Sequence, residues 1–339
     1  MTTLTAAAGQ ERARTLFPGV LACVVVAAAS TFLAEHYGAP VMLFALLLGM
    51  AMNFLSDGGN CTLGIEFTAR QVLRLGVALL GLRITLGQIA ELGWQPVAIV
   101  VLSVVLTIGV SMVMAKLMGF QSLFGLLSGG ATAICGASAA LALAAALPAH
   151  PGKERATLFT VVGVSVLSTV SMIVYPMIAH AFGLDPRLAG IFLGATIHDV
   201  AQVVGAGYSM SQQTGDVATF VKLMRVAMLV PVIVFAVMLT RARTSDGSNA
   251  GGPRPPLLPW FVVAFAVLVG INSTGWLPAV VAKSGSDISR WCLVAAIAAI
   301  GMKTQLKELA SVGLKPVLLM LAETLFLAVL VLALLRWAA

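Results

Sequence analysis

The sequence predicts an all-α integral membrane protein, a polytopic bundle of about 10–11 transmembrane helices with broken helices and an inverted-repeat architecture. Of its 339 residues, 60% are hydrophobic and only 10% are charged, whereas a soluble domain carries about 25% charged residues. Apolar runs approaching the length of about 20 residues that a membrane helix needs recur along the whole chain. A motif of matched glycines and prolines also occurs twice.

Eleven apolar runs are candidate spans, joined mostly by short connections. We expect one polytopic domain over 1–339, with a first group of spans in 17–240, a polar basic loop at 241–256 and three last spans in 257–339. The run at 70–83 is short, and the run at 187–209 is interrupted by polar residues. The expected spans are 17–35, 40–56, 70–83, 96–117, 122–147, 156–181, 187–209, 217–240, 258–276, 288–303 and 316–337.

Composition argues against several functional classes. A formal net charge of +7 in a membrane protein indicates basic cytoplasmic loops rather than nucleic-acid binding. The four cysteines are scattered without CxxC spacing, so we expect neither a metal site nor another cofactor. No GxxxxGK[ST] loop is present, which argues against ATP as the energy source. Arg12 and Arg14 precede the first apolar run, which we interpret as a retained helix rather than a signal peptide.

The positive charges give a conflicting topology. Arg241, Arg243 and Arg254 indicate a cytoplasmic 241–256 loop. Counting three spans back then places Lys153 and Arg155 outside, against the same rule. Either a re-entrant segment within 187–209 or one miscounted span would resolve the conflict, so absolute orientation stays open.

Two internal similarities are present. Residues 81–97 and 301–317 match in one register, including Gly81 with Gly301 and Pro96 with Pro316. The copies lie an odd number of predicted spans apart, which places them in opposite orientations as in inverted-repeat transporters. More weakly, the tripeptide GAT occurs at 130–132 and again at 194–196, which we interpret as local convergence on a glycine-rich helix break.

The stretch 128–138, SGGATAICGAS, is built almost entirely from small residues within apolar surroundings. Glycines allow a helix to break at mid-membrane, where freed backbone groups can meet a polar substrate. The alternative is a close helix crossing without a ligand. Under the first interpretation the substrate would contact Gly129, Gly130, Thr132, Gly136 and Ser138.

A second polar group lies in 190–207, where His198, Asp199 and Gln202 follow Thr196 and can share one helical face. A charge at the bilayer centre costs about 2.5–3.5 kcal/mol, so Asp199 should face a cavity or a partner. This group predicts a proton or cation relay, in which a histidine could titrate near neutral pH. Alternatively the segment is re-entrant or ends near the surface, and His198 caps a neighbouring helix.

Lys222 and Arg225 are spaced i,i+3 near the start of an apolar span. One could neutralise Asp199 while the other meets an anionic substrate. Alternatively both extend to the lipid headgroups. Glu323, inside the last span, needs a partner that the sequence does not reveal. No nucleophile–base pair stands out, so we expect no enzyme activity.

Several of these motifs resemble a known family. SGGATAICGASAA, GIFLGATIHDVAQVVGAG, VKLMRV and the PWFV…GINS run are similar to the bacterial inner-membrane family labelled sulfate exporters, over essentially the whole chain. The resemblance implies an anion exporter linked to sulfonate and taurine breakdown. It also implies a fold grouped with cation/proton antiporters and bile-acid symporters, with a core of broken helices that moves against a scaffold.

We therefore expect a multi-pass protein of the bacterial inner membrane that exports sulfite, sulfate or a sulfonate as a secondary transporter. The substrate would meet the 128–138 backbone, Thr196, Lys222 and Arg225, while His198, Asp199 and Gln202 would couple H⁺ or Na⁺. A passive anion channel and an organic-anion symporter are the alternatives. A homo-oligomer is compatible with the sequence, and the direction of transport is open.

Overall fold

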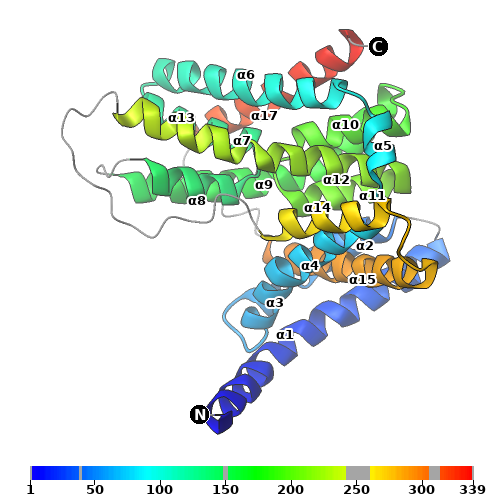
Figure 1. Cartoon of the computed structure of the whole chain (residues 1–339). Helices are drawn as coiled ribbons and strands as arrows, with labels where there is room; N and C mark the ends of the chain where they lie inside the picture. The colour runs from blue at the N-terminus through cyan, green and yellow to red at the C-terminus, as the bar shows by residue number, and fades with distance from the viewer. Residues whose placement is uncertain (1, 38–39, 148–151, 242–259, 305–313, 338–339) are drawn as a thin grey trace. The chain divides into compact units, whose positions relative to one another are not determined.

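The computed structural model describes residues 2–37, 40–147, 152–241, 260–304 and 314–337, and within these ranges it is helical without a β-strand (Figure 1). The N-terminal helices are α1 (Thr2–Tyr37), α2 (Val41–Ala51), η1 (Asn53–Ser56), α3 (Thr62–Phe67), η2 (Thr68–Val72), α4 (Leu73–Leu79), η3 (Leu80–Leu82) and α5 (Leu86–Glu91). The remaining helices are α6 (Gln95–Leu117), α7 (Ser122–Ala133), α8 (Ala137–Ala146), α9 (Lys153–Ala181), α10 (Pro186–Thr196), α11 (Val200–Met210), α12 (Gln212–Ala227), α13 (Leu229–Arg241), α14 (Trp260–Ser273), α15 (Ala279–Lys303) and α17 (Leu314–Trp337).

Six stretches of helix are long and apolar enough to cross a membrane. This confirms the predicted all-α polytopic class, because a bilayer requires every spanning segment to satisfy its own backbone hydrogen bonds. The six stretches are Arg14–Tyr37, Gln95–Leu117, Lys153–Ala181, Gln212–Leu239, Val280–Lys303 and Leu314–Trp337.

The helices form two compact units, each assembled from separate pieces of the chain. Unit 1 comprises 1–91, 208–210 and 260–305, and unit 2 comprises 92–207, 211–259 and 306–339. After Arg241, the predicted loop 241–256 lies outside the described residues, as does most of the second repeat copy at 301–317.

Unit 1 is held together by close helix crossings at glycines. A Cβ atom on Gly49 of α2 would lie 2.3 Å from the Ala298 carbonyl oxygen of α15, and one on Gly301 would lie 2.4 Å from that of Leu46. Only glycine allows such backbone approaches, which are typical of helix packing in membranes.

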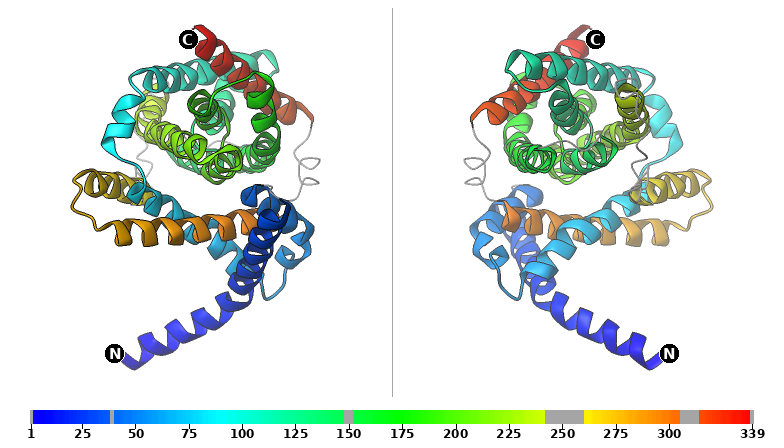
Figure 2. Two further views of the ribbon diagram at one scale, coloured as in Figure 1. Left: turned by 90° about the vertical axis from the view of Figure 1, so that its right-hand side faces the viewer. Right: turned by 90° about the vertical axis from the view of Figure 1, so that its left-hand side faces the viewer.

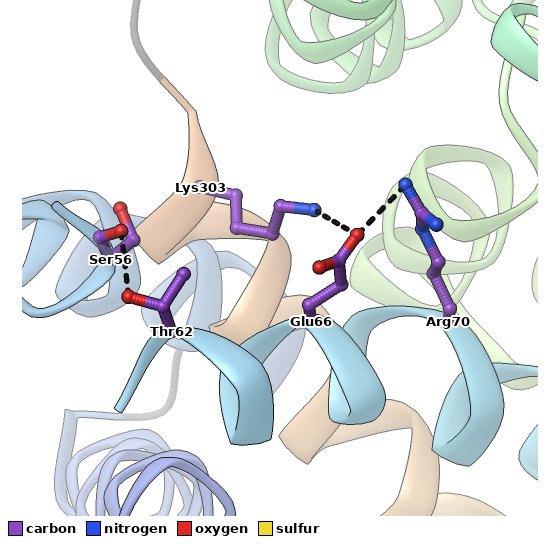
Figure 3. Close-up of polar contacts among 5 residues, drawn as sticks. All are labelled: Ser56, Thr62, Glu66, Arg70 and Lys303. Carbon is purple, nitrogen blue, oxygen red and sulfur yellow. Dashed lines mark hydrogen bonds and ion pairs between the residues drawn. The ribbon is translucent and has the colours of Figure 1, made fainter. Parts of the chain in front are cut away.

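The short run predicted at 70–83 begins earlier in the structure, at Thr62, because polar side chains at its start find partners within unit 1. Glu66 pairs with Arg70 at 2.9 Å and with Lys303 at 3.9 Å (Figure 3). The Thr62 hydroxyl donates to the Ser56 carbonyl oxygen at 3.2 Å. The π-helical turn η2 follows directly and carries the helix on into α4.

In unit 2, the segment predicted as a span at 122–147 is a helical hairpin. The chain turns between α7 and α8 so that Gly130, one turn before the end of α7, lies beside Leu143 of α8. A Cβ on Gly130 would be 2.4 Å from the Leu143 Cδ1 atom. In a continuous helix these two residues would be about 20 Å apart. We call α7 and α8 hairpin 1.

The segment predicted at 187–209 is a second hairpin, formed by α10 and α11. α10 runs in the same direction as α12, because Gly190 packs on Val217 and Gly194 packs on Val221. α11 then returns, which brings Gly207 against Gly215 near the beginning of α12. We call α10 and α11 hairpin 2. Figure 1 places the two hairpins at opposite ends of unit 2, and Figure 2 shows the unit's helices nearly end-on.

These hairpins correct the predicted count of spans, because each returns to the side from which it entered. They also remove the conflict in the charge pattern. When hairpin 2 is counted as re-entrant, the chain crosses the membrane twice between Lys153 or Arg155 and Arg241. The first crossing is α9 and the second is α12 with α13. All three residues then lie on the same side, as the positive-inside rule requires.

Candidate functional site

The tips of the two hairpins meet inside unit 2. α7 ends at Ala133 and α8 begins at Ala137, while α10 ends at Thr196 and α11 begins at Val200. A Cβ on Gly136 would lie 3.7 Å from the carbonyl carbon of His198. Across the same junction, His198 Nδ1 lies 3.0 Å from the Thr132 carbonyl oxygen. Each predicted helix break therefore exists, directly after its GAT motif, and the two breaks are in contact.

Lys222 of α12 holds the carbonyl ends of both half-helices. Its ammonium group donates to the carbonyl oxygens of Ile134 at 2.6 Å and Ile197 at 2.9 Å, and also to that of His198. A lysine has three N–H donors, so this side chain is fully used by the two tips.

Arg225, one turn further along α12, also donates hydrogen bonds to the carbonyl ends of both half-helices, through its planar guanidinium group. Nε donates to Ala133 O at 2.7 Å and Nη2 to Thr132 O at 2.9 Å, both at the end of α7. Nη1 donates to Gly194 O and Ile197 O, each at 3.1 Å, at the end of α10. Each helix C-terminus carries about half a negative charge, which the two cations neutralise.

The headgroup interpretation of Lys222 and Arg225 is therefore wrong, because both side chains are fully buried. They fix the two hairpins to α12 and supply positive charge behind the tips. The prediction that one of them contacts an anionic substrate directly stays a prediction, and for Lys222 such a contact would require it to release a carbonyl oxygen.

The amino ends of the returning helices differ from the carbonyl ends. Asp199 is the N-cap of α11, where its Oδ1 accepts from Ala201 N–H at 2.9 Å, and its own N–H donates to Ser168 Oγ at 3.0 Å. The N-cap of α8 is Gly136, which gives no side-chain cap, and Ser138 in the first turn of α8 is exposed. Half-buried Asp199 and exposed Ser138 thus belong to the accessible part of the tips.

The other predicted substrate residues are enclosed in helix contacts. Gly129 and Gly130 lie within α7 rather than at the break, and a Cβ on Gly129 would be 2.5 Å from Ser111 Cβ of α6. The Thr196 hydroxyl donates to Phe192 O at 2.6 Å within α10. Gln202, which was predicted to take part in ion coupling, is also buried, and its Oε1 atom has no hydrogen-bond partner among the described residues.

Glu323 of α17 is the residue whose partners the sequence did not reveal. Its carboxyl group is buried among three hydroxyls. Ser128 Oγ donates to Oε1 at 2.7 Å, Thr132 Oγ1 donates to Oε2 at 3.0 Å, and Ser111 Oγ contacts Oε1. The sequence shows an acidic residue inside a span, which indicates that Glu323 needs a partner. No sequence pattern links it to the hydroxyl residues at 111, 128 and 132.

Gly136 provides a test of the tip geometry. Its φ of +65° is unfavourable for residues with a Cβ, although a Cβ would meet only ordinary contacts at His198. We expect Gly136→Ala to destabilise the protein by about 1–3 kcal/mol through backbone strain. Gly109→Ala is the control, since a Cβ there meets nothing within 4 Å. Equal melting temperatures for the two purified variants would contradict the tip geometry.

The fold and site define a class: an α-helical polytopic membrane protein with two re-entrant hairpins whose tips meet in the interior of one unit. The family model described as "Conserved hypothetical protein 698" matches residues 18–320. The chain belongs to this family, whose related proteins carry the name UPF0324 membrane protein.

Relatives are similar over nearly the full length. The chain is 58% identical to a UPF0324 membrane protein of Chlorobaculum tepidum, covering 95% of this chain and 89% of the relative. It is 54% identical to the UPF0324 membrane protein TauZ of Paracoccus denitrificans, covering 93% of each chain. No solved structure matches the chain significantly. These findings confirm a multi-pass bacterial membrane protein, and the sulfate-exporter label stays a prediction.

Proposed function

We propose that this protein is a secondary transporter for a small anion, with sulfite, sulfate or a sulfonate as the substrate class. The observation that carries the proposal is the meeting of two re-entrant hairpin tips inside unit 2. Non-helical backbone at membrane depth is found where protein encloses it or where it lines a water-filled cavity, and broken helices form the substrate sites of many transporters.

The preference for an anion follows from the hydrogen-bond partners of the backbone groups at the ends of the half-helices. The carbonyl ends of α7 and α10 are covered by Lys222 and Arg225, which leaves no strong acceptor site for a cation there. The amino end of α8 has no side-chain cap and carries the exposed hydroxyl of Ser138. A helix amino end without a side-chain cap and with two cations behind it favours an oxyanion.

Coupling to H⁺ or Na⁺ is assigned to the Asp199 region. Its carboxylate is half-buried at the tip of hairpin 2, next to the hairpin 1 tip that would hold the anion. Binding of a cation there would offset the charge of the substrate as the loaded site moves across the membrane. His198 joins hairpin 1 to α17 beside this carboxylate, and Gln202 lies one turn further along α11.

The anion site is tested by placing a carboxylate side chain of the protein itself in the site. Ser138→Asp places a carboxylate in the first turn of α8, where it is favoured by the helix dipole by about 0.3–1 kcal/mol. We expect a slightly higher melting temperature and loss of the thermal stabilisation that sulfite or sulfate gives the wild type. Ser138→Asn is the uncharged control and should keep that stabilisation.

Unchanged sulfite or sulfate stabilisation of the Ser138→Asp protein would place the anion elsewhere. Stabilisation of the wild type by carboxylates and not by sulfite or sulfate would favour the organic-anion symporter instead. Flux of the anion that ignores imposed pH and Na⁺ gradients would favour a passive channel.

A further inference from the structure

Glu323 lies in a fully enclosed group of oxygen atoms contributed by three helices. The three hydroxyls that surround its carboxyl group come from Ser111 on α6 and from Ser128 and Thr132 on α7. Only 1% of Glu323 is exposed, and the hydroxyls of all three partners are buried as well. An ionised carboxylate inside a membrane protein is costly, so a carboxyl group held there without a cationic partner among the described contacts calls for a specific role.

The geometry fits a bound proton better than a bound metal cation. Each hydroxyl contacts the carboxyl oxygens directly, at 2.7 Å for Ser128 and 3.0 Å for Thr132. These are hydrogen-bond distances, whereas oxygen ligands of a metal cation surround the ion and contact it instead of each other. The hydroxyl oxygens around Glu323 are therefore placed to form hydrogen bonds with its carboxyl group.

The hydroxyl hydrogens around Glu323 are too few to satisfy all of its contacts when its carboxyl group is ionised. Ser111 has one hydroxyl hydrogen but two near acceptors, Glu323 Oε1 and the Gly125 carbonyl oxygen at 2.7 Å, while Ser128 Oγ lies further away at 3.4 Å. With Glu323 ionised, Ser111 can serve only one of them. With Glu323 protonated, its O–H donates to Ser111 Oγ, and the Ser111 hydroxyl donates to Gly125 O. The contacts of Ser111 with Glu323 and with Gly125 are then both satisfied.

A similar count applies to His198, but neighbouring charges lead to the opposite result. His198 Nδ1 faces Thr132 O, and Nε2 faces the Thr324 hydroxyl at 3.0 Å, which also lies 2.8 Å from Met320 O. A doubly protonated ring would satisfy all three contacts. However, Lys222 and Arg225 both donate to carbonyls of the same tips, so a third positive charge there is opposed. His198 is therefore neutral, with Thr324 donating to Nε2.

We propose that Glu323 is a buried proton-binding carboxyl group that couples the state of hairpin 1 to the pH gradient. This inference rests on the proposed transport function and adds a proton bound at Glu323 to the cation assigned to Asp199. On release, Glu323 passes from COOH to COO⁻ plus H⁺, and the Ser111 hydroxyl turns from Gly125 O to the carboxylate. The ionised carboxylate then depends on hydrogen bonds from the α7 hydroxyls of Ser128 and Thr132. Deprotonation therefore strengthens the contact between hairpin 1 and α17, and protonation weakens it.

Infrared spectroscopy of the reconstituted protein tests the site directly. We expect a carbonyl stretching band of a protonated carboxylic acid that shifts in D₂O, grows as pH falls and is absent in Glu323→Gln. Asp199→Asn should keep this band, as should Glu66→Gln, whose carboxylate is ion-paired in unit 1. Should Glu323→Gln retain the whole band, or should the wild type lack it at every pH at which it is folded, the proposal is overturned.

Transport by the same variants separates this inference from the proposed function. Glu323→Gln should bind the anion yet lose acceleration of its flux by a pH gradient, while Glu66→Gln keeps it. Gradient-driven flux that survives in Glu323→Gln would overturn the coupling role while leaving anion transport intact. Conversely, a wild type that shows the band but moves none of the tested anions would contradict the proposed function and keep the proton site.

Discussion

Replacing Lys222 by methionine is expected to unfold unit 2 or to lower its melting temperature severely. The carbonyl oxygens of Ile134 and His198 would lose their Lys222 donor, and that of Ile197 would keep only Arg225 Nη1. A buried group left unsatisfied costs about 1–3 kcal/mol, so the total is a large part of the roughly 5–15 kcal/mol that stabilises a typical domain. Methionine keeps the length of the side chain, so the loss measures hydrogen bonding and charge rather than packing.

The matched control is Lys116→Met at the exposed end of α6, which should leave the melting temperature unchanged. Arg225→Lys should give an intermediate loss, because an ammonium group cannot reproduce the four hydrogen bonds of the guanidinium fork. Thermal unfolding in detergent, followed by size-exclusion chromatography, measures all three. A Lys222→Met protein as stable as Lys116→Met would show that Lys222 does not hold the two hairpin tips together.

Asp199→Asn is expected to abolish gradient-driven transport while the protein stays folded. Asparagine is as good an N-cap as aspartate, so its side-chain oxygen can still accept from Ala201 N–H at the start of α11. Only the negative charge is lost, and with it the coupling cation. We expect stability within about 0.5 kcal/mol of the wild type and flux in a gradient no faster than without one.

Asp199→Ala provides the comparison, since it removes both the charge and the cap. It should lose about 1 kcal/mol of stability in addition to coupling. If Asp199→Asn still responds to pH and Na⁺ gradients, Asp199 carries no coupling role. If both variants unfold, the residue is needed for structure, and the Glu323 measurements remain to test coupling.

The sequence was sufficient for the class of fold and for the two helix breaks. Low charge and long apolar runs require a polytopic helical protein, and the glycine-rich stretch 128–138 and the polar group 198–202 both lie at real breaks. It was not sufficient to tell a span from a hairpin. A run of about 25 apolar residues has the same composition whether it continues across the bilayer or turns back.

The roles of individual site residues depended on long-range contacts. Lys222 and Arg225 were identified as important, but their carbonyl partners lie on both hairpins, 24–31 residues away on hairpin 2 and 88–93 residues away on hairpin 1. Gly129 and Gly130 were expected at the break, yet they serve the packing of α7 against α6 and α8. Glu323 could not be assigned, because its hydroxyl partners are about 200 residues distant in sequence.

Coupled transport of a small anion at the hairpin tips can be measured as flux in proteoliposomes. Radiolabelled sulfite and sulfate would be followed with and without an opposing pH gradient, for the wild type and for Asp199→Asn. We expect flux driven by the gradient in the wild type and no such flux in the variant. No flux of either ion by folded wild-type protein, under any gradient, would contradict this expectation.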